Sequence, residues 1–360
     1  MLKLLGSLSQ YLKSSPIKTE SMLFRMHNKL TAVMLLACSA ILTATQYVGS
    51  PISCIVQGLP EHVVNTYCWI TSTFTMPDAY FRQVGKEVAH PGVSNDFGDF
   101  SARKYYTYYQ WVCFALFFQG VLCWLPQWLW NAWENGLMET IVMGMNLSMD
   151  TKENIEKKKN VLMEYLTLNM KRHTSYVYRY FVCEFLCLVN IIGQLYLMNH
   201  FLGGEFFSYG TRVLQFSNMD QEKRVDPMVY VFPRMTKCIF HKYGPSGTIQ
   251  THDSLCLLPL NVFNEKAYIF FWFWHLLMAL LLLGLVVYRL LIIFAPSFRP
   301  RLLHMAAKRL PIEICRSVNS KVNLGDWWIL YGLAHNMDPI IYREFLAEFV
   351  KKISNGKMNI

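Results

Sequence analysis

Four long apolar stretches dominate the hydrophobic pattern of the chain. Each has about the length that a helix needs to cross a bilayer core, roughly 20 residues. They cover residues 30–48, 109–130, 178–202 and 268–294. More polar segments lie before, between and after them, at residues 1–29, 49–108, 131–177, 203–267 and 295–360. The pattern predicts an all-α polytopic membrane protein built on a bundle of four transmembrane helices.

Composition strengthens this prediction. Hydrophobic residues make up 53% of the chain and charged residues only 16%, whereas soluble proteins carry roughly a quarter charged residues. Many Trp and Tyr residues stand where apolar stretches begin or end, which is typical of rings at a membrane interface. The net charge of +10 is not concentrated in one polar region. We therefore expect the lipid bilayer, and no nucleic acid, as a partner.

The distribution of Lys and Arg predicts the orientation in the membrane. Four spans place both termini on one side, together with the segment 131–177. These segments hold more Lys and Arg than 49–108 and 203–267. Because cytoplasmic segments are enriched in positive charge, we expect cytoplasmic termini in a multi-pass plasma-membrane protein. The segments 49–108 and 203–267 are then the first and second outer loops. Residues 1–29 lack the apolar core of a signal peptide, so the first span is expected to direct insertion.

The ten cysteines divide by region. Five lie within the apolar stretches, where small buried side chains are the expected role: Cys38, Cys113, Cys123, Cys183 and Cys187. Cys315 lies in the C-terminal segment and is expected to be an ordinary reduced thiol, with redox sensing as the alternative. The first outer loop holds Cys54 and Cys68, and the second holds Cys238 and Cys256. An oxidising exterior favours disulfides among these four, and their spacing does not choose between the three possible pairings.

A zinc site is the rival interpretation of the second outer loop. Cys238, His241, His252 and Cys256 have a spacing that resembles zinc ligands. Such a site would be extracellular and would leave Cys54 and Cys68 to pair alone. We therefore expect neither a metal nor another cofactor.

Local patterns predict a few elements outside the spans. Residues 238–260 read as a β-hairpin around the turn at residues 244–247. Its glycines do not form a phosphate loop, because no lysine follows Gly247. Residues 154–170 and 338–353 have helical spacing, and we expect them to pack in a helical cytoplasmic dome. The leucines of residues 4–12 also follow helical spacing, which predicts a short amphipathic N-terminal helix.

Several short motifs together resemble one protein family. Tyr108, Tyr109, Gln110, Trp111 and Val112 open the second span as YYQWV, a signature of the innexins, the gap-junction proteins of invertebrates. Further motifs are similar to insect innexins, and they follow the same order along nearly the whole chain: residues 24–27, 66–70, 236–238, 241–247, 258–261 and 325–328. Because some viruses also encode innexins, the resemblance fits either an animal protein or a virus-encoded relative.

The resemblance implies a structure and a function. Disulfides would join Cys54 to Cys256 and Cys68 to Cys238, which makes a rigid outer platform from the two loops. The chain would form a homo-oligomeric, octameric hemichannel that docks with the hemichannel of an adjacent cell and passes ions and small metabolites. Mixing with other innexins stays open. The N-terminal helix would fold into the pore mouth, with Met1, Leu2 and Leu5 as pore-lining residues.

Two alternative functions belong to different classes. An undocked, pannexin-like hemichannel would release ATP or other small metabolites from a single cell. A polytopic membrane enzyme is the more distant alternative, and since no catalytic motif is present we do not expect an enzyme. The sequon at residues 146–148 falls in a cytoplasmic segment. The outer loops therefore carry no glycan acceptor that would obstruct docking.

Polar residues inside the spans also have two interpretations. Glu184, Asn190 and Gln194 in the third span suggest a transport pathway, since intramembrane polar groups are often functional. The resemblance favours helix or subunit contacts, or a position facing a wide vestibule. His275 is expected to be a helix-packing group and not a proton relay. Pro126 kinks the second span, either as a gating hinge or only to shape the bundle.

Overall fold

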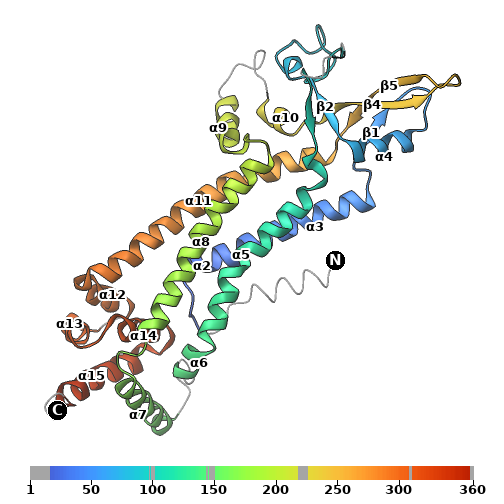
Figure 1. The fold of residues 1–360 in the computed structure, drawn as a ribbon. Helices are drawn as coiled ribbons and strands as arrows, with labels where there is room; N and C mark the ends of the chain where they lie inside the picture. Colours follow the sequence, from blue (N-terminus) through green and yellow to red (C-terminus); the bar gives the residue numbers. More distant parts are fainter. Residues whose placement is uncertain are drawn as a thin grey trace. The chain divides into compact units, whose positions relative to one another are not determined.

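The computed structural model describes residues 17–96, 98, 102–142, 145, 151–217, 226–307 and 310–356. The chain divides into two compact units. The first unit comprises Met1–Thr31, Cys123–Asn190 and Ala279–Ile360, and the second comprises Ala32–Leu122 and Ile191–Met278. Each unit is considered by itself, with the element labels of Figure 1.

Among the described residues, four helical stretches are long and apolar enough to cross a membrane, as predicted. The first, Met22–Val48, is formed by α2 (Met22–Arg25), a π-helical segment η1 (Met26–Thr31) and α3 (Ala32–Val48). The other three are α5 (Val112–Glu134), α8 (Thr174–Phe201) and α11 (Leu260–Phe294). The fold class predicted from the hydrophobic pattern is confirmed.

Three of these stretches begin earlier than the hydrophobic pattern indicates. In the two with the larger extension, α2 and α11, the polar residues at the start have local partners. At the start of α11, Asn261 Nδ2 donates to Pro233 O at 2.7 Å. Glu265 in the next turn accepts from Arg234 at 2.7 Å. At the start of α2, the Ser21 side chain caps the helix by accepting from the Phe24 amide. Because these partners satisfy the polar groups, the helices can include or begin at polar residues ahead of the apolar stretch.

A small antiparallel sheet in the second unit combines strands of both outer loops. Its order is β1 (Ser53–Ile55), β5 (Ile249–Leu257), β4 (Met235–Tyr243), β2 (Thr73–Thr75) and β3 (Lys104–Tyr106). β4 and β5 form the predicted hairpin, with Gly247 in the turn at φ +82°. The helix α4 (Glu61–Thr71) packs against β1 and β4.

Short helices complete the outer loops of the second unit. They are η2 (Pro77–Tyr80), η4 (Tyr108–Gln110), α9 (Phe206–Ser217) and α10 (Pro227–Val231). α9 and α10 contact each other. α4, α9 and α10 were not predicted. α10 has only five residues and is too short to show a helical period, whereas the 12 residues of α9 are amphipathic and carry a helical signal in the sequence.

The first unit carries a helical region beside its parts of the membrane-spanning helices. It contains α6 (Leu137–Val142), α7 (Lys152–Leu168), η5 (Pro296–Phe298), α12 (Arg299–Ala306), α13 (Ile312–Lys321), α14 (Leu324–Asn336) and α15 (Pro339–Gly356). The predicted helices at 154–170 and 338–353 are present as α7 and α15. Trp327, Phe345 and Phe349 are buried among these helices. Lys159 of α7 reaches Glu348 of α15 at 2.8 Å, so the segment between the second and third spans contacts the C-terminal segment.

Candidate functional site

Two disulfides join the two outer loops within the second unit. Cys54 bonds to Cys256, and Cys68 bonds to Cys238. These are the two pairs that the resemblance implies. The antiparallel register of β1 and β5 sets Cys54 directly opposite Cys256, and Cys68 comes from α4 to meet β4. The sheet, α4 and these two bonds together are called the outer platform below.

The same bonds exclude the zinc interpretation. Cys238 and Cys256 are oxidised, so neither offers a thiolate to a metal. The sulfurs of Cys54, Cys68 and Cys256 lie within 4.8 Å of one another, but all three belong to disulfides. The zinc interpretation is therefore wrong.

The disulfides lie in an apolar core. All four cysteines are at most 1% exposed, and Ile52, Val64 and Leu258 pack against them. Nearby polar groups are satisfied: Cys54 N–H donates to Asn65 Oδ1 at 2.7 Å, and Ser254 Oγ donates to Cys238 O at 2.8 Å. The outer platform thus has its own core, held by burial and by covalent bonds.

The family signature connects this platform to the start of α5. The Tyr109 hydroxyl donates to Cys68 O at 3.2 Å, and Gln110 Nε2 donates to Trp69 O. Tyr108 reaches the other outer loop, where its hydroxyl donates to Val231 O at 3.0 Å. The first three signature residues therefore fasten both outer loops to one helix.

The last two signature residues lie where that helix begins, with Trp111 just before α5 and Val112 as its first residue. Val112 is 1% exposed, whereas the Trp111 side chain is 61% exposed. An exposed Trp next to the start of a membrane-spanning helix is typical of an interface anchor. The signature thus combines hydrogen bonds to the outer loops with a side chain suited to the membrane interface.

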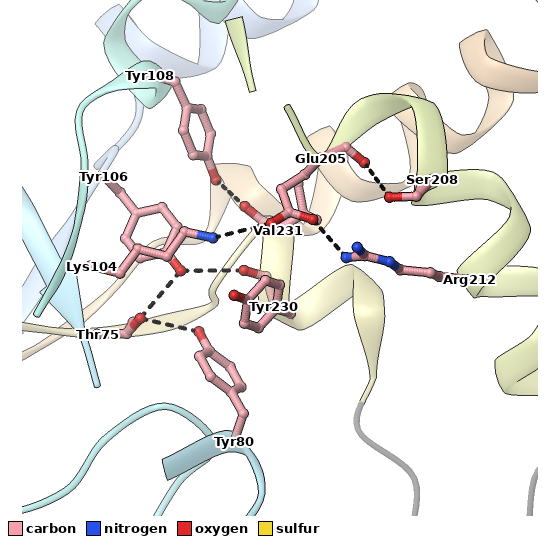
Figure 2. A network of polar contacts seen from close by, with 10 residues as sticks. All are labelled: Thr75, Tyr80, Lys104, Tyr106, Tyr108, Glu205, Ser208, Arg212, Tyr230 and Val231. Carbon is pink, nitrogen blue, oxygen red and sulfur yellow. Dashed lines mark hydrogen bonds and ion pairs between the residues drawn. The ribbon is translucent and has the colours of Figure 1, made fainter. Parts of the chain in front are cut away.

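Buried tyrosines extend the fastening across the sheet (Figure 2). Tyr106 donates to Tyr230 O at 3.2 Å, and Thr75 Oγ1 donates to the Tyr106 hydroxyl at 3.2 Å. Tyr80 donates to Thr75 Oγ1 at 3.5 Å. Burial raises the pKa of both Tyr80 and Tyr106. Both phenols therefore keep their protons at neutral pH and act as donors.

A charged cluster lies beside these tyrosines (Figure 2). Glu205 lies between two cations, with Arg212 Nη1 at 2.6 Å and Lys104 Nζ at 3.9 Å. Lys104 Nζ also lies 4.2 Å from the centre of the Tyr230 ring. Burial lowers the pKa of Lys104, and the Glu205 carboxylate opposes that shift. Glu205 thus links the first outer loop to the second without a covalent bond.

Replacing Glu205 by glutamine is expected to loosen the outer platform modestly. The change leaves Lys104 and Arg212 facing each other without a carboxylate between them. Partly exposed ion pairs contribute about 1 kcal/mol or less, so we expect the thermal midpoint of the purified protein to fall by roughly 1–3 °C. Glu164→Gln, at an exposed position of α7, is the matched control. Equal midpoints for the two variants would contradict this role of Glu205.

Glu184 makes a helix contact in the first unit. Its carboxylate receives two hydrogen bonds from Arg289, from Nε at 2.6 Å and from Nη2 at 2.8 Å. Ser21 Oγ donates to the same carboxylate at 2.9 Å. The Glu184 side chain is 0% exposed, and the Arg289 guanidinium lies 4.8 Å from the Trp328 ring centre. The pair joins two membrane-spanning helices, which favours the helix-contact interpretation.

Gln194 makes a similar contact in the second unit. Its Nε2 donates to Gln119 O at 3.2 Å, and its Oε1 lies 3.0 Å from His275 Nε2. His275 Nδ1 lies 2.7 Å from Phe271 O, one turn earlier in α11. His275 is therefore a buried helix-packing group. Asn190 is half-buried.

Other predicted residues have more limited outcomes. Pro126 is buried inside α5, which continues through it, and its role as a hinge stays a prediction. Met1, Leu2 and Leu5 lie outside the described residues, as does the sequon at 146–148. Burial raises the pKa of the Cys315 thiol to about 11. It is therefore protonated at neutral pH, as an ordinary free thiol would be.

Sequence reasoning missed the partner of Glu184. Arg289 stands within the fourth apolar stretch, and Glu184 stands within the third. An unpaired charge in a bilayer is costly. The presence of an acidic residue in one span and a basic residue in another could therefore have predicted the ion pair.

Comparison with known proteins agrees with this structure. The Innexin family model matches residues 20–353. The chain is 61% identical over 359 residues to Innexin inx1 of Schistocerca americana, covering 100% of this chain and 99% of the relative. It is 60% identical over 357 residues to Innexin inx1 of Drosophila melanogaster, covering 99% of both chains. Innexin shaking-B of Drosophila melanogaster is 42% identical over 358 residues, with 99% and 96% covered. This chain belongs to the innexin family.

Proposed function

We propose that this protein is a subunit of a gap-junction channel. It assembles into an oligomeric hemichannel in the plasma membrane, and the hemichannel docks with that of an adjacent cell to pass ions and small metabolites. The observation that carries the proposal is the outer platform, in which two disulfides hold strands of both outer loops in one sheet. A rigid platform suits docking, because little conformational freedom is lost when it meets a partner.

The chemistry of the cysteines supports the proposed orientation. Both disulfides lie in segments 49–108 and 203–267, which we place outside the cell. Cys315, a free thiol, lies in the helical region of the first unit, which we place in the cytoplasm with both termini. The two compartments then match the oxidation states of their cysteines.

The assembly and the pore are proposed from the family resemblance. Eight subunits form one hemichannel, and two hemichannels meet end to end. Met1, Leu2 and Leu5 line the narrow part of the pore. Pro126 serves as a hinge in α5. The pore selects weakly, because wide pores of this kind have no ring of carbonyl groups that replaces the hydration shell of an ion.

Paired-cell recording tests the proposed function. Communication-deficient cells are paired with the protein in both cells, in one cell or in neither, and the junctional conductance is measured. We expect conductance only when both cells express the protein, because docking requires a platform on each side. Uncoupled pairs together with a new membrane conductance in single cells would favour the undocked, metabolite-releasing hemichannel.

A further inference from the structure

One edge of the outer platform is open. β5 pairs with β1 only from Leu255 to Leu257, while its pairing with β4 continues to Ile249. Within the described part of the chain, no strand pairs with the outer side of residues 249–253. These five residues are called the open β5 edge. An uncovered strand edge presents unpaired N–H and C=O groups and is a template for another strand.

The side chains of the open β5 edge suit pairing with an identical strand. If Thr251 is the centre of an antiparallel self-pair, Gln250 faces His252 of the other copy, and Ile249 faces Asp253. No like charges then lie opposite each other, and the central Thr–Thr pair is favourable in sheets. His252 Nε2 is buried without a hydrogen-bond partner among the described residues. The Gln250 side chain is exposed, and in the self-pair it lies opposite His252 of the second copy.

The ends of the edge fix this centre. β1 covers β5 from Leu255 onward, and the turn begins before Ile249. Ser254, next to the stretch that β1 covers, is buried. The part of the edge that a second strand can reach is therefore residues 249–253, with Thr251 in the middle. The outer edge of β4 is less suitable, because a self-pair there centred on His241 sets Lys242 against Phe240, and edge lysines usually prevent pairing.

The orientation of the hairpin favours a partner in the opposite membrane. In Figure 1, β4 and β5 extend past the end of α3 of the same unit, in roughly the direction of that helix. Hairpins that approach from two facing membranes run antiparallel to each other. Two docked identical rings are also related by twofold axes, which a self-paired antiparallel strand satisfies at its central residue. Copies in one ring are related by rotation about the pore, so their β5 edges cannot pair in this way.

We propose that the open β5 edge pairs antiparallel, with Thr251 at its centre, with the same edge of a copy of this chain in the adjacent cell. The inference rests on the proposed function and adds the surface that docks. Main-chain hydrogen bonds supply the attachment, as in other strand-addition complexes. The side chains of Gln250 and His252 supply the register.

Charge exchange across the junction tests the pairing. One variant carries Gln250→Glu with His252→Glu, and the other carries Gln250→Lys with His252→Lys. Pairs of cells with the same variant place like charges opposite each other, and we expect their conductance to fall about tenfold or more. A mixed pair, with the Glu variant in one cell and the Lys variant in the other, places opposite charges face to face. In this pair we expect most of the wild-type conductance to return. His241→Glu and His241→Lys, on exposed positions of β4, are the control pair, and they should show no such exchange.

The outcomes separate the two proposals. Wild-type pairs that conduct, with variants that show no exchange effect, would overturn the β5 pairing and leave the gap-junction function standing. If mixed pairs recovered conductance for the His241 variants and not for the variants at residues 250 and 252, docking would be assigned to β4. That result would also overturn the β5 pairing. Wild-type pairs that never conduct would count against the function itself. Surface labelling establishes that each variant reaches the plasma membrane.

A crosslink provides a second measurement that does not require conduction. Thr251→Cys is expressed with one epitope tag in one cell population and with a second tag in another. Opposed residues of antiparallel strands have Cα atoms about 4.5–5.5 Å apart, within the range that a disulfide spans. We expect a reducible dimer that carries both tags only when the populations are in contact, and none from His241→Cys. If crosslinked dimers formed only within one cell population and never carried both tags, Thr251 would lie between subunits of the same membrane. That result would overturn the proposal.

Discussion

Replacing Cys68 by serine is expected to abolish junctional conductance between paired cells, and the same holds for Cys54, Cys238 and Cys256. Each cysteine is at most 1% exposed and lies in the core of the outer platform. Each substitution removes a covalent link between the two outer loops and leaves a hydroxyl and an unpaired thiol in an apolar core. The conductance of cell pairs that both express the variant measures the effect.

The expected loss is large because the bonds close long segments. The two pairs are separated by 202 and 170 residues. In the chain-entropy model, a bond that closes so long a loop contributes about 5 kcal/mol at most. The membrane already restricts the unfolded chain, so the real contribution is smaller. A few kcal/mol is still a large share of the stability of a small sheet.

Double substitutions make this prediction sharper. Removing both Cys68 and Cys238 is expected to be no worse than removing one, because a lone cysteine is free to form wrong disulfides. Cys315→Ala, at a buried free thiol of the helical region, is the control and should leave coupling intact. Normal coupling in all four single variants would show that the covalent links are not needed for docking.

The elements that sequence predicts best are those decided by local pattern. Four apolar stretches are sufficient to predict four membrane-spanning helices, because the length of a span is set by the bilayer. The hairpin of β4 and β5 follows from its strands and the turn that contains Gly247. Both predictions rest on residues that are close in sequence.

The elements that sequence predicts poorly are those decided by distant partners. Spacing alone leaves three pairings of the outer cysteines, and the choice depends on the register that sets Cys54 opposite Cys256. The start of α11 is hidden by Asn261 and Glu265, whose partners, Pro233 and Arg234, precede the helix. Glu184 suggests a transport site until Arg289 of another span is seen beside it. In each case the missing information is a contact between segments far apart in the chain.

Replacing Arg289 by methionine is expected to lower the thermal stability of the protein strongly, and more than replacing its partner Glu184 does. The substitution leaves the Glu184 carboxylate 0% exposed, with the Ser21 hydroxyl as a remaining donor. Removing one partner of a buried ion pair typically costs 3–5 kcal/mol, since the other charge stays buried without compensation. We expect the thermal midpoint of the detergent-purified protein to fall by roughly 5–10 °C.

The opposite substitution, Glu184→Gln, is expected to be milder. Arg289 then keeps the aromatic rings around its guanidinium, with Trp328 at 4.8 Å, Tyr288 at 5.2 Å and Phe181 at 5.4 Å. Aromatic faces stabilise a desolvated cation by about 2 kcal/mol. Among the described residues, the isolated Glu184 carboxylate keeps one hydrogen bond, from the Ser21 hydroxyl, whereas the isolated guanidinium keeps these aromatic rings. The two halves of the pair therefore differ in what remains after the other is removed.

The double variant Glu184→Gln with Arg289→Met separates the ion pair from simple packing. It removes both charges, so its thermal midpoint should recover to above that of Arg289→Met alone, as expected for coupled residues. Arg179→Met, at an exposed position of α8, is the matched control and should change the midpoint by no more than about 1–2 °C. If the double variant were as unstable as the sum of the single changes, the two side chains would act independently. The contact between the third and fourth spans would then depend on packing and not on the charge pair.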